Sequence, residues 1–389
     1  MTELKGKHNV AKIFTDLVDQ GTLNQIKETL NLKAYADSKI RIMPDCHLGK
    51  GATIGTTMTI TDKVAPSAVG VDIGCGMYVV PIAKSQIDFQ KLDQVIRERI
   101  PSGMGNFRKE VHPMAEKVDL SKLKAPVDKS KALLSIGTLG SGNHFVEING
   151  GEKHNYLVIH SGSRGIGASV AKYYIDLAVE RTKGYNSVDI GKMKLEGRHS
   201  EIADALKSRD VVPKDLSFLT GDDLDDYLHD IKILQFYAEV NRVAMASEIL
   251  HGMGWTAESG VFQSVHNYID IENRILRKGA TSAQLDETLI IPINMRDGSL
   301  ICEGLGNPDW NYSAPHGAGR LMSRNEAKSK LSVDDFKNEM SCVFSTTVNQ
   351  ETLDEAPGAY KPIESILENI QDTVRVIEHI RPLYNFKGV

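Results

Sequence analysis

Cysteine is scarce in this sequence, and the few that are present lie far apart. The chain has 389 residues, and its four cysteines, none in a C-x-x-C pair, are Cys46, Cys75, Cys302 and Cys342. A scaffold built on disulfides needs more cysteines at closer spacing, so that class of protein is excluded. A cysteine with a special role is therefore expected to be a ligand.

Long apolar runs and an excess of positive charge are also absent. No stretch approaches the roughly 18 apolar residues of a membrane span, and the N-terminal MTELKGKHNVAKIF is charged and lacks a signal-peptide pattern. The formal net charge of -5 argues against attraction of nucleic acid by bulk charge, although a local cluster of arginines can still bind phosphates. The sequence predicts a cytoplasmic protein without a membrane segment.

Internal repeats, low-complexity tracts and Pro/Gly/Ser linkers are absent as well, so we expect one large domain over 1–389. Periodicity predicts helices over 10–32, 167–182, 222–250 and 363–380. Strands are predicted over 39–43, 69–82, 132–136, 144–148, 155–159, 288–293 and 299–302. This uneven order favours an α+β or complex α/β fold over a doubly wound sheet.

The segment VGVDIGCGM places Asp72 and Cys75 three residues apart among glycines, where the chain can bend so that both side chains converge. A carboxylate oxygen with a thiolate sulfur suits a borderline metal such as Mn, Fe, Co or Zn. A buried structural cysteine beside a capping aspartate explains the same segment. The motif alone leaves both readings open.

Further Gly-rich turns supply more groups of the same kind. GTLGSGNHFVEI delivers His144 into a strand, LVIHSGSRGIG ends a strand at His160, and QSVHNYIDI adds His266. Arg164 beside a helix start offers a phosphate site, although the glycines there also suit a plain strand-to-helix turn. No segment fits a P-loop or the GxGxxG fingerprint. Metal and phosphate sites together favour phosphoryl or nucleotidyl transfer.

The segment APHGAGRLMSR sets His316 among small residues. The histidine is a candidate metal ligand, a candidate nucleophile, or the polar end of a helix start. In a helix, Arg320 and Arg324 would share one face.

The motifs DIGCGM, GSGNHFVE, HSGSRG, VHNY, RKGA and APHGAGRLMSR, followed by the ending YNFKG, stand in an order that closely resembles the RtcB family of RNA-splicing ligases. The resemblance runs from PDCHLGKGATIG to the C-terminus. It implies a single domain with mixed sheets around a central metal cleft. It also implies a GTP- and Mn(II)-dependent ligase that joins RNA 3'-phosphate or 2',3'-cyclic phosphate ends to 5'-hydroxyl ends, through a covalent histidine-GMP and an activated RNA 3'-end, in tRNA splicing or RNA repair.

The resemblance also implies roles for individual residues. Cys75 would bridge two manganese ions, one completed by His160 and His266 and the other by Asp72 and His144, and His316 would be the guanylylated nucleophile. GTP would be bound by Asn143, Phe145, Glu147, Tyr360 and Lys387. Asp45 would sit beside the metals, and RNA or nucleotide phosphates would meet Arg164, Arg242, Lys278, Arg320 and Arg324.

Partners implied by the resemblance are RNA, GTP and, in some lineages, a small activator protein; we expect a monomer. Cys46 stands where an aliphatic residue is more usual and would put a second thiol near the metals. An alternative function is a two-metal cyclic phosphodiesterase or RNA-end hydrolase that does not ligate. A non-catalytic RNA-binding protein is disfavoured because the ligand set and His316 are all present.

Overall fold

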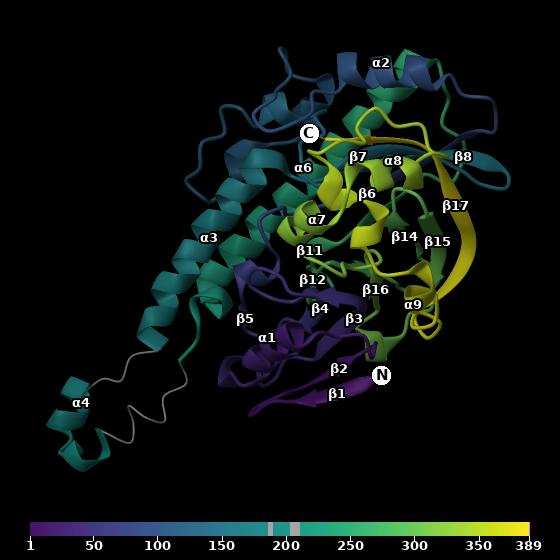
Figure 1. The fold of residues 1–389 in the computed structure, drawn as a ribbon. Helices are drawn as coiled ribbons and strands as arrows, with labels where there is room; N and C mark the ends of the chain where they lie inside the picture. The colour runs from purple at the N-terminus through teal and green to yellow at the C-terminus, as the bar shows by residue number, and fades with distance from the viewer. Residues whose placement is uncertain (186–189, 203–210, 389) are drawn as a thin grey trace.

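The computed structural model describes residues 1–185, 190–202 and 211–388. Two large β-sheets, two short strand pairs and a group of helices make up a mixed α+β arrangement (Figure 1). This confirms the predicted α+β class. Among the described residues, no helix has both the length and the apolar character needed to cross a bilayer.

The first sheet contains the N-terminal strands and has the order β1-β2-β3-β4-β12-β11. The pair β2 and β3 is parallel, and all other neighbours are antiparallel. Its strands are β1 (Thr2–Lys5), β2 (Val10–Ile13), β3 (Ile40–His47), β4 (Ile54–Thr59), β11 (Asn267–Asp270) and β12 (Ile275–Lys278).

The second sheet has the order β10-β6-β8-β7-β17-β15-β14 and is antiparallel throughout. Its strands are β6 (Gly76–Ala83), β7 (Phe145–Gly150), β8 (His154–Ser161), β10 (Phe262–Val265), β14 (Thr288–Asn294), β15 (Gly298–Gly304) and β17 (Val374–Lys387). Two short antiparallel pairs complete the strands: β5 (Lys63–Val64) with β9 (Leu219–Thr220), and β13 (Ala280–Ser282) with β16 (Ser313–Pro315).

The two large sheets adjoin at residue 266. Strand β10 ends the second sheet at Val265, and β11 begins the edge of the first sheet at Asn267. His266 alone separates them, and its N–H donates to the carbonyl of Cys75 at 2.9 Å. Side chains from both sheets can therefore meet at this junction.

The helices pack around the sheets, with α3 and α6 side by side at one flank (Figure 1). The longest, α6, ends at Gly254, whose left-handed φ of 69° suits a residue without a Cβ. The helices are α1 (Gln20–Leu30), α2 (Phe89–Arg99), α3 (Arg164–Tyr185), α4 (Ile190–Leu195), α6 (Gly221–Met253), α7 (Arg324–Lys330), α8 (Val333–Glu339) and α9 (Ile363–Leu367).

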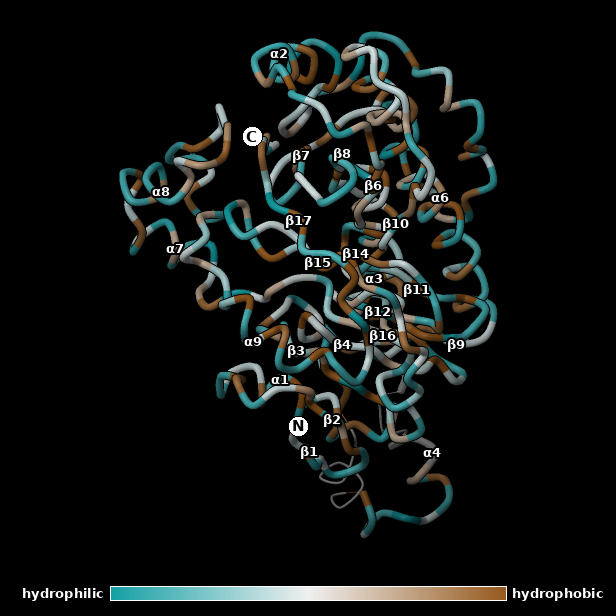
Figure 2. The backbone as a smooth tube through the Cα atoms, turned by 90° about the vertical axis from the view of Figure 1, so that its right-hand side faces the viewer, coloured by the Kyte–Doolittle hydropathy of each residue, from teal (hydrophilic) through white to brown (hydrophobic). Residues whose placement is uncertain are grey.

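Buried apolar side chains form a large core between the first sheet and helices α3 and α6, and a second core between the second sheet and helices α2 and α6. Figure 2 shows the hydrophobic stretches concentrated along central strands such as β12 and β14. Because helix α6 contributes to both cores, it ties the two sheets together at the junction.

Two predicted helices are largely wrong. Residues 10–13 form strand β2, and helix α1 starts only after Asp19, which caps it by accepting from the N–H of Thr22 at 2.9 Å. The helix predicted over 363–380 stops at Leu367, and strand β17 follows. The run VRVIEHI is rich in β-branched residues, which favour a strand over a helix, and it pairs with β15.

Two predicted strands also differ from the structure. Residues 133–135 form a short 3-10 helix, and the segment 69–75 is a turn that precedes β6. The remaining predicted strands and the helices over 167–182 and 222–250 are confirmed with shifted ends. The strand predicted over 69–82 is thus confirmed from residue 76 onward, as β6, and the strand predicted over 132–136 is wrong. Both departures lie next to glycines with positive φ, at Gly70, Gly74 and Gly137, where the chain turns instead of continuing.

Candidate active site

The turn before β6 is shaped by glycines that allow a close approach to other elements. A Cβ on Gly74 would lie 2.9 Å from the Cβ of Ala238, and one on Gly76 would lie 2.7 Å from the Cα of Val265. The N–H of Gly74 donates to the carbonyl of Asn267 at 2.7 Å. This packing fixes the turn that carries Asp72 and Cys75 against helix α6 and the sheet junction.

Five side chains from separate elements converge at this junction. They form two groups whose ligand atoms lie within 4.8 Å of one another, and Cys75 belongs to both groups. One group adds His160 and His266, and the other adds Asp72 and His144. We call these five residues the ligand cluster. Their pairing is the one that the family resemblance implies.

The distances within the ligand cluster are short. The Sγ of Cys75 lies 3.2 Å from the Nε2 of His160 and 3.5 Å from that of His144. The Nε2 atoms of His160 and His266 are 3.2 Å apart, and the Nε2 of His144 lies 2.9 Å from Asp72. Electron-rich atoms therefore face one another across a small space.

The backbone fixes the orientation of two of the imidazoles. The Nδ1 of His144 lies 2.9 Å from the carbonyl of Leu139, and the Nδ1 of His160 lies 3.0 Å from the carbonyl of Asn143. In His160, an Nδ1–H that donates to the carbonyl leaves Nε2 as a lone pair, which is how metal-binding histidines are held. Burial lowers the pKa of His160 and of His266 far below the usual histidine value, so both rings are neutral.

The carboxylate of Asp72 is ionised. Burial raises its pKa, but the hydrogen bond and charge of His144 outweigh burial and lower the pKa to about 2. Arg164 lies alongside, with Nη1 3.3 Å from the Nδ1 of His144. Its φ of 57° is uncommon for a residue other than glycine, and it directs the guanidinium over Gly140, where a Cβ would clash.

His316 lies next to the ligand cluster, in the loop after β16, with its ring centroid 4.9 Å from that of His266. Its Nδ1 is 2.6 Å from the Oδ2 of Asp45, which is fully buried, and the same oxygen accepts from the N–H of His316 at 3.1 Å. With Nδ1 held by the carboxylate, Nε2 is the nitrogen that can react.

Arg320 and Arg324 do not lie on one helix, so the helix-start interpretation of this segment does not hold for Arg320. Arg320 forms an extended bridge with Tyr360, and α7 begins only at Arg324, after the capping residue Ser323. The two guanidiniums nevertheless converge, because Nη1 of each contacts Glu355, at 3.3 and 3.0 Å. Tertiary contacts, not helical spacing, bring them together.

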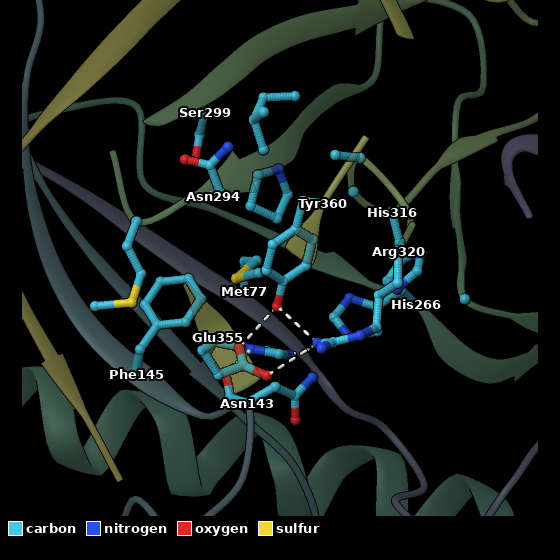
Figure 3. Close-up of a pocket in the computed structure, with 18 of the residues that line it drawn as sticks. Met77, Asn143, Phe145, His266, Asn294, Ser299, His316, Arg320, Glu355 and Tyr360 are labelled. Carbon is cyan, nitrogen blue, oxygen red and sulfur yellow. Dashed lines mark hydrogen bonds and ion pairs between the residues drawn. The ribbon is translucent and has the colours of Figure 1, made fainter. Parts of the chain in front are cut away.

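A cavity of about 290 Å³ opens beside His316 (Figure 3). We call it the His316 cavity. His160 and His266 of the ligand cluster line one part of it. All five residues predicted to bind GTP also line it: Asn143, Phe145, Glu147, Tyr360 and Lys387. Sequence positions that are up to 244 residues apart thus meet around one space.

Glu355 is a buried residue of this cavity that the sequence did not reveal. Its carboxylate contacts the hydroxyl of Tyr360 at 2.8 Å and the Nη1 of Arg320 (Figure 3). It also contacts the Nζ of Lys387 at 3.0 Å and the Nη1 of Arg324. We call this group the Glu355 cluster. Burial raises the pKa of Glu355, but the three cations outweigh burial and lower it to about 2. The only sequence signal was an acid five residues before Tyr360.

Glu147 is a second buried carboxyl at the cavity. It accepts from the side-chain amides of Asn149 at 2.8 Å and Asn385 at 2.6 Å. Burial raises its pKa to about 7 despite these hydrogen bonds and the charge of Lys387. The ammonium of Lys387 also lies 4.8 Å from the centroid of the Phe145 ring, so a cation and a flat apolar face adjoin.

Two predicted phosphate ligands are placed elsewhere. Arg242 has no exposed surface, and its Nη1 donates to the carbonyls of Gly74 and Ser161, at 2.7 and 2.9 Å. Lys278 is also buried, and its Nζ donates to the carbonyls of Lys50 and Ser67. Both cations therefore hold backbone segments in this structure, and their contact with phosphates stays a prediction.

Cys46 does not join the ligand cluster. Among the described residues, neither metal-ligand group contains it, and its side chain packs in the large core. Strand alternation explains this, because Asp45 and Cys46 point to opposite faces of β3.

The site combines an imidazole bonded to a buried aspartate, a cluster of possible metal ligands and a cavity lined by cations. This combination is typical of the class of metal-dependent group-transfer enzymes. Comparison with known proteins gives the family. The model of the family described as tRNA-splicing ligase RtcB matches residues 25–132 and 113–388. The chain belongs to the RtcB family and is an enzyme of the ligase class.

Individual relatives agree with this assignment over most of their length. The chain is 34% identical over 388 residues to the RNA-splicing ligase RtcB of Escherichia coli K12, with 90% of each chain covered. It is 26% identical over 413 residues to the RNA-splicing ligase RtcB2 of another Escherichia coli strain, covering 95% of this chain and 93% of the relative. The chain is 25% identical over 448 residues to the tRNA-splicing ligase RtcB of Aeropyrum pernix, covering 89% of this chain and 87% of the relative.

Proposed function

We propose that this chain is a GTP- and Mn(II)-dependent RNA ligase that joins a 3'-phosphate or 2',3'-cyclic phosphate end to a 5'-hydroxyl end. The observation that carries the proposal is the position of His316. Its Nδ1 is bonded to buried Asp45 at 2.6 Å, and the ring lines a cavity shared with the ligand cluster and with three cations. A hydrolase would need neither this nucleophile nor a nucleotide cavity.

In the proposed first step, the Nε2 lone pair of His316 attacks the α-phosphorus of GTP. The bond from that phosphorus to the bridging oxygen breaks, pyrophosphate leaves, and GMP stays on the histidine. The ring becomes positively charged as the N–P bond forms, and the carboxylate of Asp45 stabilises that charge through Nδ1–H. An oxygen of the RNA 3'-phosphate then displaces His316 from GMP.

The last step joins the strands. The 5'-hydroxyl oxygen attacks the activated 3'-phosphorus, the bond to GMP breaks, and GMP leaves. Arg320 and Arg324 at the cavity, and Arg164 beside the ligand cluster, supply positive charge for the phosphate oxygens.

The ligand cluster fits a pair of divalent ions. The Nε2 atoms of His160 and His266 lie 3.2 Å apart, and two neutral imidazoles with the Sγ of Cys75 nearby are a donor set that suits a divalent cation. Cys75, His160 and His266 would hold one ion, and Cys75, Asp72 and His144 the other. When bound, the ions would supply positive charge against the phosphate oxygens. The identity of the metal is part of the proposal, because thiolate and imidazole also suit zinc and cobalt.

The guanine would lie between the ring of Phe145 and the polar groups around it. Glu147, Tyr360 and Lys387 offer a carboxyl, a hydroxyl and an ammonium, which can recognise the edge of a base. Asn143 would contact the phosphates from the rim of the cavity. In this assignment Glu355 orients the arginines, Tyr360 and Lys387 from behind.

The test is covalent labelling. The purified chain with GTP labelled at the α-phosphate and Mn(II) is expected to retain GMP in an acid-labile, alkali-stable bond. His316→Ala is expected to retain none, and His229→Ala, an exposed histidine on α6, should label as the wild type does. Label on His316→Ala would overturn the assignment.

A second assay separates ligation from hydrolysis. Paired RNA ends, one with a 3'-phosphate and one with a 5'-hydroxyl, are expected to be joined with GTP and not with ATP. Cyclic-phosphate opening without GTP and without a joined product would instead identify a cyclic phosphodiesterase. Because the assay uses the purified chain alone, joining would also exclude an obligatory activator protein.

A further inference from the structure

We propose that Lys361 is a positioning residue that fixes Asp45 against His316. The inference deepens the proposed function, on which its kinetic part rests. Lys361 is unusual because it is buried and its ammonium bonds to backbone carbonyls.

The side chain of Lys361 forms hydrogen bonds to the segment around Asp45. Its Nζ donates to the carbonyls of Pro44 and Cys46, both at 3.1 Å, and to that of Leu17 at 3.3 Å. An ammonium has three N–H groups, so these three acceptors use its full capacity. Two of the carbonyls belong to the residues on either side of Asp45, so the ammonium fixes the backbone of the aspartate from both ends.

The backbone of Lys361 forms a hydrogen bond to the loop that carries His316. Its N–H donates to the carbonyl of Gly319 at 3.0 Å, next to the bridge between Arg320 and Tyr360. Gly319 has a φ of 77°, and a Cβ there would lie 2.3 Å from the carbonyl oxygen of Asp45. The loop after His316 is therefore seated directly on the backbone of Asp45.

One residue thus links both partners of the 2.6 Å contact between Asp45 and the Nδ1 of His316. The two partners are 271 residues apart in sequence, and no local secondary structure relates them. Loss of the ammonium would leave the carbonyls of Pro44 and Cys46 without this donor, and Asp45 could then move away from His316. A displacement of about 1 Å can cost on the order of 100-fold in rate at a reacting group.

The first measurement needs neither nucleotide nor metal. In metal-free protein with ¹⁵N-labelled histidine, the Nδ1–H of His316 is expected to give a downfield proton resonance, assigned by its loss in His316→Ala. Lys361→Met, which keeps an unbranched apolar side chain and removes the ammonium donors, is expected to lose that resonance. Lys39→Met removes a partly exposed lysine just before β3 and should keep it.

The second measurement is the rate of histidine guanylylation. Lys361→Met is expected to slow it about 100-fold, with the KM for GTP within about threefold of the wild type, because Lys361 does not line the cavity. A purely structural role would change both constants or neither. Should Lys361→Met fail to fold, Lys361→Gln takes its place, since its amide is one bond too short to reach both carbonyls.

The outcomes separate the two proposals. If the resonance is absent from the wild type, or persists unchanged in Lys361→Met and Lys361→Gln, the positioning role is overturned. If the resonance behaves as expected but the wild type forms no histidine-GMP, the proposed function fails while the positioning role stands.

Discussion

The ligand cluster and the Glu355 cluster lie on the same cavity and have opposite charge arrangements. In the ligand cluster a thiol, a carboxylate and three imidazoles face one another with no cationic side chain among them. In the Glu355 cluster one carboxylate accepts from two guanidiniums, an ammonium and a hydroxyl. The ligand cluster offers its atoms to a cation, and the Glu355 cluster already contains its own cations.

The difference separates the work of the two regions. A thiol, a carboxylate and three imidazoles gathered at short range are the ligand types that bind transition metals. A buried carboxylate surrounded by cations instead fixes those cations in place, and their excess positive charge remains available to an anion. The comparison predicts that the ligand cluster depends on added metal and that the Glu355 cluster does not.

The largest effect is expected for Cys75→Ser. Cys75 is the one residue common to both ligand groups, so its loss should weaken both metal sites. We expect guanylylation to fall by on the order of 100-fold or more, because changes at a metal site commonly cost 10–100-fold even in the supporting residues. Metal content by mass spectrometry and labelling with GTP measure the effect.

The matched control for this substitution is Cys302→Ser, which changes a buried cysteine of β15 in another core. It should retain metal and activity. Equal losses in the two variants would show that burial, and not ligation, explains the importance of Cys75.

The next largest effect is expected for Glu355→Gln, and it should be a loss of folding stability. Removing one partner of a buried ion pair costs about 3–5 kcal/mol, because the remaining charges are left uncompensated. The folded-state pKa is lowered from 4.5 to about 2, so the ionised carboxylate stabilises the fold above about pH 4.5 and that contribution is lost as the pH falls toward 2. Urea unfolding across this range should show a steeper loss for the wild type than for the variant.

Added metal should stabilise the folded wild type by somewhat less than Glu355→Gln destabilises it. A divalent ion at about 100 times its dissociation constant contributes about 2.7 kcal/mol if it binds only the folded state. The rise in Tm should appear in Glu355→Gln as well and vanish in Cys75→Ser. A rise that survives in Cys75→Ser would place the metal outside the ligand cluster.

The smallest effect is expected for Glu147→Gln. The folded-state pKa of Glu147 is raised from 4.5 to about 7, so the unfolded chain ionises first, and the wild type loses stability as the pH rises between these values. The variant cannot ionise and should lack this loss. Unfolding free energies at about pH 5 and pH 8 test it, and a parallel pH dependence in both proteins would contradict the buried placement.

Sequence motifs identified most of the site because its residues sit in short Gly-rich turns. DIGCGM and HSGSRG each place a ligand directly beside a strand, so the type and order of the ligands were readable from the chain. Resemblance to the RtcB family then supplied the pairing, and the structure has the same pairing. The residue roles themselves stay proposals until tested.

The errors arose where tertiary contacts override local pattern. Residues 374–380 lie in a strand because they pair with β15, and the following residues 381–387 pair with β7. The burial of Arg242 and Lys278, whose cations donate to backbone carbonyls, had no signal in the sequence either. Glu355 and Lys361 had no motif of their own, since their partners lie up to 344 residues away in sequence.

The sequence by itself determined the chemistry available to this protein: the ligand types, the nucleophile candidate and the glycines that let turns approach one another. Only the tertiary structure decided which charges face the cavity and which are enclosed. The physical reason is that a side chain's function here depends on what neutralises it. His316 owes its free Nε2 to a buried aspartate 271 residues away, and that distance in sequence leaves no local pattern to read.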